Sequence, residues 1–368
     1  MNKITKEKNM TNLKKVGLTA LAGSLVAVSA HAGEMSVSGA ANVTYKTGAA
    51  NDAAQSLGHS TQIAFTGAGE LDNGYEVNTF VVYKDDLSAL SSSALTVTMG
   101  SMGTIGVSKA GGFNVNGGYD ETYPRAYEET SDAGGISASD YVGSVADDNA
   151  IIYKAPSINI AGVDISAGAE YSFQAGSGTT KDGGSIARSD DKGTAYGVGV
   201  TASVAGLTFG AYASEAENIK NGGNTPDNDE FTGSAFVNYS FGPVSIGYQQ
   251  TYVDAGAAQA GASTTTAAKT VGTSGGIFQD ESMSIAFNVN ENLSVSYAET
   301  EGTYSDQAYT TGTTTKTADI KQDSDSLQVA YSMGAMSVKA YKTEINNPAY
   351  DTDAAKLTIN EIAIGLAF

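Results

Sequence analysis

Apolar and polar side chains alternate along several stretches of this chain, and the alternation limits what the chain can fold into. The first stretch carries an apolar residue at nearly every second position, namely Met35, Val37, Ala41, Val43 and Tyr45. Successive side chains of a β-strand point to opposite faces, so a period of two predicts a strand with one apolar and one polar face. The pattern returns in residues 75–84, 231–241 and 283–289.

The predicted strands are joined by connections of two lengths that follow each other in turn. The short ones are rich in Asn, Gly and Pro, as tight turns are: 71–74, 100–103, 156–162, 205–206, 242–243, 290–292 and 334–335. The long ones are polar: 47–58, 85–93, 110–148, 172–192, 216–228, 254–278, 301–322 and 345–356. Seven short and eight long connections predict 16 strands.

This rhythm is typical of a sheet that closes inside a membrane. In a bilayer every backbone group needs an internal partner, so a sheet must close, and such barrels have short turns at one end and long loops at the other. A soluble sandwich also alternates faces but has no reason to sort its connections by length. Only 16% of the residues are charged, against about 25% in soluble domains. We therefore predict an all-β chain, a 16-stranded antiparallel transmembrane β-barrel, wide enough for an aqueous channel.

The two ends of the chain fit export to an outer membrane. Residues 1–32 combine lysines, an apolar run and the small residues Ala30 and Ala32 at a cleavage site, which is typical of a signal peptide. The segment holds five lysines and one glutamate, so its removal leaves a barrel of residues 33–368 and lowers the net charge from −20 to −24. At the other end a terminal aromatic follows alternating apolar residues, the signal that outer-membrane barrels present to their assembly machinery: Ile362, Ile364, Leu366 and Phe368.

Composition excludes several other classes of protein. The chain has no cysteine, which removes disulfide scaffolds and thiolate metal sites, and 40 acids against 20 bases, which disfavours nucleic-acid binding. No catalytic motif is present and the predicted mature chain has one histidine, His59, so we expect no enzyme. We expect no cofactor either, although the acidic runs 190–191 and 227–230 could bind Ca²⁺ through oxygen ligands.

Three stretches resemble the Gram-negative general porins, of alphaproteobacterial type. Residues 98–109 resemble the hairpin that leads into the porin constriction loop, residues 149–156 resemble the strand that leaves it, and the last strand ends in Phe368. The resemblance implies a homotrimer of barrels in the outer membrane, with a third external loop that folds inward. Two positions depart from the family, because Gly106 and Ile152 stand where it usually places arginines of a basic wall.

The longest connection, 110–148, is the candidate constriction. It is predicted to present acids with a single base, and the candidate pore residues are Asp120, Glu121, Arg125, Glu128, Glu129 and Asp132. Strand parity places Lys46, Lys84 and Lys154 on the lumen wall. Lys109 is predicted on the lumen wall with them because it matches a basic position of the family, although parity with Val107 points it outward. Fixed carboxylates attract cations, so we predict a cation-preferring diffusion channel for small hydrophilic solutes and ions.

Three alternatives remain open on the sequence alone. The long connection could be a solvated surface loop without a pore role. The chain could be a substrate-specific outer-membrane channel or a phage receptor. In a different class, it could be a secreted all-β adhesin or surface-layer protein. A saturable block of conductance by one solute would identify a specific channel, and extraction from the outer membrane would separate a barrel from an adhesin.

Overall fold

A computed structural model describes most of the chain. The described residues are 33–48, 54–85, 89–109, 112–130, 137–143, 150–175, 192–218, 229–254, 256, 268–271, 275–306 and 318–368. The predicted signal peptide, including Ala30 and Ala32, lies outside them, as does Asp132. Among the described residues, no helix is both long and apolar enough to cross a membrane.

The described part of the chain is almost entirely sheet. Its strands are β1 (Met35–Thr47), β2 (Gln55–Glu70), β3 (Glu76–Lys84), β4 (Ala89–Thr98), β5 (Thr104–Lys109), β6 (Ala150–Lys154), β7 (Ile158–Ile160), β8 (Val163–Ser172), β9 (Lys192–Val204), β10 (Leu207–Asn218), β11 (Glu230–Phe241), β12 (Val244–Asp254), β13 (Ile277–Asn288), β14 (Leu293–Ser305), β15 (Ile320–Met333), β16 (Met336–Asn346) and β17 (Leu357–Ala367). Short 3-10 turns are η1 (Gly100–Met102), η2 (Asn116–Gly118), η3 (Ser139–Tyr141) and η5 (Pro348–Tyr350).

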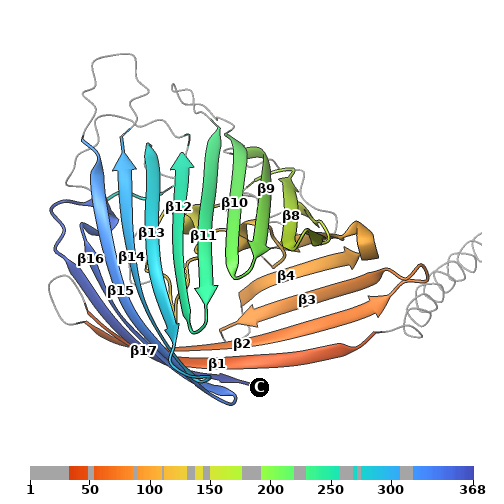
Figure 1. Cartoon of the computed structure of the whole chain (residues 1–368), viewed down its shortest axis with the longest axis horizontal. Coiled ribbons are helices and arrows are strands. Elements are labelled where there is room, and N and C mark those ends of the chain that lie inside the picture. Colours follow the sequence, from red (N-terminus) through yellow and green to blue (C-terminus); the bar gives the residue numbers. More distant parts are fainter. Residues whose placement is uncertain are drawn as a thin grey trace, which may run out of the picture.

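The sheet closes on itself as an antiparallel barrel. Apart from β6 and β7, each strand pairs with its neighbours in sequence, and β1 pairs with β17 to complete the ring. Both β6 and β7 pair with β8, one beyond the other, so together they occupy one position in the wall. The 17 strand segments therefore form a 16-stranded barrel, which confirms the prediction. Figure 1 shows β8–β16 side by side, with β1–β4 crossing beside them at a steep angle.

The two faces of the wall differ as the alternation predicts. On the outer face large apolar side chains are exposed, for example Val198, Met283 and Leu327 at 56%, 57% and 59%. Their neighbours along the same strands, such as Ser282 and Gln328, are almost fully buried, at 1% and 2%. Because β-strand side chains alternate, the exposed apolar set and the buried polar set lie on opposite sides of the wall. The barrel is thus apolar outside and polar inside.

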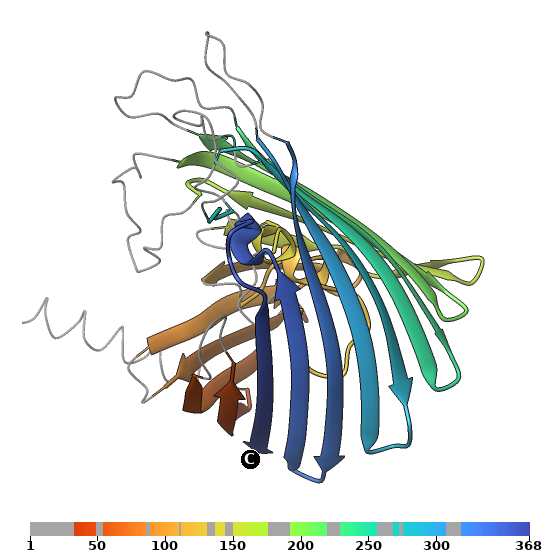
Figure 2. The same cartoon turned by 90° about the vertical axis from the view of Figure 1, so that its left-hand side faces the viewer.

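Two clusters of buried apolar residues join the wall to one long connection. We call the described residues 112–130 and 137–143 the inward segment. One cluster joins Val115, Tyr119 and Val142 of this segment to Ile152 and Phe236 of the wall. A second joins Ala138 to wall and loop residues that include Phe278, Tyr304 and Tyr350. In Figure 2 the inward segment, in yellow, lies in the hollow of the curved sheet.

The tight turns fall where the sequence predicts them, with one difference. Residues 156–162, predicted as a single turn, contain the short strand β7, and the reversal itself is confined to Ala161 and Gly162, with φ of 53° and 89°. Pro156 has no backbone N–H to donate to the ladder, so the strand is interrupted between β6 and β7.

Candidate functional site

Gln249 on β12 holds the first half of the inward segment by its backbone. The carboxamide oxygen of Gln249 accepts a hydrogen bond from the Thr122 backbone N–H at 2.8 Å. Its amide nitrogen donates to the Tyr119 carbonyl at 2.9 Å and also to the Asp120 carbonyl. Gln249 is 1% exposed and lies on the inner face of the wall. One wall side chain therefore satisfies both donor and acceptor groups of the segment's main chain.

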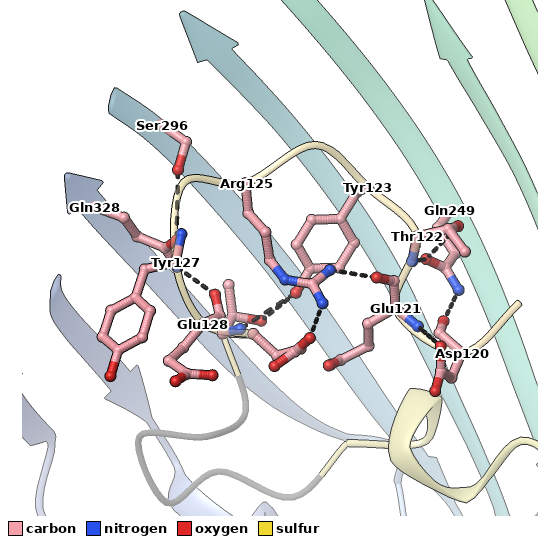
Figure 3. A network of polar contacts seen from close by, with 12 residues as sticks. Asp120, Glu121, Thr122, Tyr123, Arg125, Tyr127, Glu128, Gln249, Ser296 and Gln328 are labelled. Carbon is pink, nitrogen blue, oxygen red and sulfur yellow. Dashed lines mark hydrogen bonds and ion pairs between the residues drawn. The ribbon is translucent and has the colours of Figure 1, made fainter. Parts of the chain in front are cut away.

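Gln328 on β15 makes the equivalent contacts about half a dozen residues further along. Its carboxamide oxygen accepts from the Tyr127 backbone N–H at 2.8 Å, and its amide nitrogen donates to the Glu128 carbonyl. Between the two glutamines, Ser296 Oγ accepts from the Ala126 N–H at 2.8 Å. Figure 3 shows residues 120–128 running across the inner face of the strands between Gln249 and Gln328.

Two buried carboxylates on the wall hold the flanks of the segment. Glu170 on β8 accepts the Val115 N–H at 2.8 Å and the Tyr212 hydroxyl. Asp280 on β13 accepts the Ser137 hydroxyl at 2.8 Å and the Ala138 N–H at 2.6 Å, at the start of η3. Removing either carboxyl would leave buried polar groups of the segment without a partner, which costs about 1–3 kcal/mol for each group. The described parts of the segment are thus tied to β8, β12, β13 and β15.

Arg125 binds two acidic residues of the segment, one through its side chain and one through its backbone. Its guanidinium makes an ion pair with Glu129 and donates to the Glu121 carbonyl, and it lies 5.6 Å from the centre of the Tyr123 ring. The only base among the predicted pore residues is therefore already paired with one of the acids. Figure 3 shows Arg125 between the Glu121 and Glu128 portions of the chain.

Burial changes the titration of several groups in the segment, Asp120 and Tyr127 among them. Burial raises the pKa of the Asp120 carboxyl, although a backbone hydrogen bond and the charge of Arg125 oppose the rise. Burial, followed by a hydrogen bond to Glu361, raises the pKa of the Tyr127 phenol. Tyr127 Oη donates to Glu361 Oε1 at 2.8 Å. The phenol stays neutral at physiological pH and links the segment to β17.

The predicted acids of the pore lie together on this segment. Asp120, Glu121, Glu128 and Glu129 follow one another along the stretch held by the two glutamines. Glu121 is 7% exposed. The structure thus places four of the five predicted acids along one side of the lumen, and the fifth is Asp132, outside the described residues.

Three of the four predicted wall lysines face the lumen. Lys46 Nζ lies 3.8 Å from Glu361 Oε2, on the inner face of β1 and β17. Lys154 Nζ lies 4.6 Å from the centre of the Phe113 ring, which belongs to the inward segment. Lys84 shares its strand parity with Phe80, and the Phe80 ring comes close to Gly112.

Lys109 is different, and its predicted place on the lumen wall is wrong. It shares the parity of Ile105 and Val107, which are 40% and 49% exposed on the outer face. Val107 pairs with Ile151, which is also exposed, so the register of β5 and β6 points this row outward. The residue-by-residue parity of the strand, rather than the likeness to the family, decides the facing.

The inward segment occupies the space beside Gly106 and Ile152, the two positions where the family usually has arginines. A side chain at Gly106 would meet the Phe113 ring and the Thr96 methyl at 2.8 Å. Ile152 is 1% exposed, within the cluster that contains Val115 and Tyr119. A long charged side chain has no room at either position, so apolar packing replaces a basic wall there.

Several residues of the site are absent from the sequence-based expectation. They include wall groups that touch the segment: Glu170, Gln249, Asp280, Ser296, Gln328 and Lys339. Lys339 Nζ lies 5.0 Å from the centre of the Tyr127 ring. In the sequence these residues are recognisable only as polar residues at inward-facing positions of strands. Alternation alone does not distinguish them from other side chains that line the lumen.

Metal binding has no structural support in the described part of the chain. It contains no group of three or more His, Asp or Glu side chains that could hold an ion. The acidic positions Asp190, Asp191, Asp227 and Asn228, considered for Ca²⁺, lie outside it.

Comparisons with known proteins give a family and a fold. A family model described as Gram-negative porin matches residues 17–288. No match was found among curated proteins. Among solved structures, a porin is similar with a TM-score of 0.58 and 11% identity, over 91% of this chain and 100% of that chain.

Two further solved structures show the same fold. Salmonella typhi OmpF in complex with daunomycin has a TM-score of 0.58 and 12% identity, over 91% of this chain and 98% of that one. A mutant of the Rh. blastica porin has a TM-score of 0.53 and 13% identity, over 91% and 100%. A barrel with an apolar outer face, a polar lumen and this family match is a porin channel of the outer membrane. The chain belongs to the Gram-negative porin family.

Proposed function

We propose that this porin is a cation-preferring diffusion channel for small hydrophilic solutes and ions. The observation that carries the proposal is the acidic run held across the lumen wall. Asp120, Glu121, Glu128 and Glu129 lie on a stretch whose single base, Arg125, is paired with Glu129. Fixed carboxylates at a constriction raise the local concentration of cations and repel anions.

The basic side of the lumen is weak by comparison. Lys46 lies close to Glu361, and Lys339 faces the Tyr127 ring. Gly106 and Ile152 replace two arginines that the likeness to general porins would place on the wall. The proposed field across the channel therefore comes mainly from its acidic side.

Family membership supports a proposal on assembly and location. We propose that the signal peptide is cleaved after Ala32, that the strand ending in Phe368 is read by the barrel assembly machinery, and that three copies associate in the outer membrane. The trimer is supported by a solved relative in fold, Vibrio cholerae OmpT, which is described in a trimer form. Family membership argues against the secreted adhesin and against an enzyme. A substrate-specific channel remains the second candidate, favoured by a cavity between the inward segment and the wall.

A reversal-potential measurement in planar bilayers tests the ion preference. Under a KCl gradient we expect the sign that corresponds to cation preference, and we expect Glu128→Gln with Glu129→Gln to move the potential toward zero. Glu291→Gln, in the short turn between β13 and β14, is the matched control and should leave the potential unchanged. A potential of the anionic sign in the unmodified protein would contradict the proposal.

A further inference from the structure

A cavity of about 540 Å³ lies between the inward segment and the inner wall of β6, β8 and β9. Its polar lining consists of Asn114, Tyr119, Lys154, Ser157, Ser166 and Thr201. The remaining lining is small or apolar, and Gly118 opens into free space, since nothing lies within 4 Å of where its Cβ would be. Ligand sites are typically concave, about 300–1,000 Å³ in volume, with a few placed polar groups.

Lys154 gives this cavity a positive charge. Its ammonium group is steadied by the face of the Phe113 ring at 4.6 Å. Glu170 on the neighbouring strand attracts it, but the Glu170 carboxylate already accepts the Val115 N–H and the Tyr212 hydroxyl. Among the described carboxylates, none forms an ion pair with Lys154 within 4 Å. The charge is therefore directed to the cavity rather than neutralised in a salt bridge.

The hydroxyl groups around Lys154 supply further donors and acceptors. Thr201 Oγ1 donates to Tyr119 Oη at 3.1 Å, which leaves the phenol proton for another acceptor. Ser166 lies on the lumen side of β8 beside Gly168. None of the described residues that line the cavity is acidic, whereas two other cavities in the described wall include Asp280 or Glu128.

We propose that this cavity is a binding subsite for a small hydroxylated carboxylate, a sugar acid of about hexose size. One lysine matches one carboxylate, and the tyrosine, serine and threonine hydroxyls match a polyol chain. The inference rests on the proposed function, because the ligand reaches the cavity from the lumen of a conducting channel. The acidic lumen repels anions, so the subsite binds a class of anion that the rest of the channel disfavours.

Sodium gluconate is the probe, and glucose is its uncharged counterpart. Added to single channels in KCl, gluconate is expected to interrupt the current in a concentration-dependent way, and glucose is expected to do so only at higher concentration. Lys154→Gln should raise the half-blocking concentration of gluconate about tenfold, since a charge-assisted hydrogen bond is lost. Gly118→Leu, which adds a side chain at the lining of the cavity and leaves Lys154 unchanged, should do the same. Lys356→Gln removes an equal charge from the connection before β17, outside the cavity lining, and should leave the half-blocking concentration unchanged.

The outcomes separate this inference from the proposed function. A channel that conducts but is not interrupted by gluconate, or is interrupted equally by glucose, overturns the subsite and leaves the porin function intact. Equal half-blocking concentrations in the unmodified protein and in both pocket variants also overturn it. If the protein fails to conduct KCl, the proposed function fails, and calorimetric titration of gluconate into the detergent-solubilised chain still decides the subsite by the presence or absence of saturable binding.

Discussion

Gln249 and Gln328 are placed to hold the inward segment by its main chain. Each carboxamide accepts one backbone N–H and donates to a backbone carbonyl of the segment, and each is nearly fully buried. Buried backbone groups left without partners cost about 1–3 kcal/mol each. These two residues are therefore expected to fix where the acids lie in the lumen.

Replacing Gln249 with alanine tests this anchoring. The change leaves the Thr122 N–H and the Tyr119 carbonyl without their partner, so we expect local loosening of the segment, measured as faster amide hydrogen exchange at Thr122 and larger open-channel current noise. Gln250→Ala is the matched control, because the Gln250 side chain points to the outer face and bonds Glu281 at 3.1 Å. Equal exchange at Thr122 in both variants would contradict the anchoring role.

Asp120 gives the channel a predicted dependence on pH. Burial raises its pKa, so on acidification it takes up a proton at a higher pH than an ordinary aspartate does. Cation preference should therefore begin to fall above the usual aspartate range as pH decreases, and it should recover fully on return to neutral pH. When the reversal potential of Asp120→Asn is measured against pH, this first part of the decline in cation preference should be absent. An identical pH profile in the variant would show that other carboxylates carry the effect.

At the residue scale, the sequence predicts the acids of the segment but not their anchors. The acids stand close together in the sequence, where a cluster of charge is visible. Their anchors do not, since Thr122 and Gln249 are 127 residues apart and meet only because the barrel closes. Alternation fixes which face a residue takes, but it does not say which inner residues a loop will cross.

At the scale of elements, the strands and turns follow local chemistry closely. The short connections require glycines in the left-handed region, and Gly206 and Gly242 both have positive φ, at +84° and +56°. Such turns are readable from sequence because few residues other than glycine adopt these angles without strain. The division of 150–160 into β6 and β7 is less readable, because a proline removes one hydrogen bond from the ladder but does not decide whether the strand resumes beyond it.

The two turn glycines separate backbone strain from steric contact. Gly242→Ala should destabilise the barrel by about 1–2 kcal/mol, the penalty for an L-residue in the left-handed region, since nothing lies within 4 Å of its added Cβ. Gly206→Ala should cost more, because its Cβ would also collide with the Ser240 carbonyl oxygen. The measurement is the free energy of unfolding from urea titration of the barrel in lipid vesicles. Equal losses in the two variants would show that the contact with Ser240 is relieved at no cost.

At the scale of the whole molecule, the barrel wall separates lipid on its outer face from water in the lumen. Val329 on β15 is exposed on the outer face, and the next residue, Ala330, faces the lumen opposite Lys339 of β16. Alternation and the rhythm of connections predict this arrangement from the sequence alone. They do not predict the inward path of the segment, because that path depends on contacts with strands far along the chain.

A pair of glutamate substitutions tests this separation. Val329→Glu places a charge in hydrocarbon and should lower the free energy of unfolding by roughly 1–3 kcal/mol. Ala330→Glu places the same charge in the aqueous lumen beside Lys339 and should be close to neutral. Urea titration in vesicles measures both. A similar loss in the two variants would mean that the outer face of β15 is not in contact with lipid.

The backbone contacts of Gln249 and Gln328 with the inward segment have a consequence for how the charge of this channel can change. Because the wall holds backbone atoms of Tyr119, Thr122, Tyr127 and Glu128, the identity of the neighbouring charged side chains is not part of the grip. The charge at Glu128, whose backbone carbonyl rather than its carboxylate meets Gln328, can therefore change while this contact with the wall is kept.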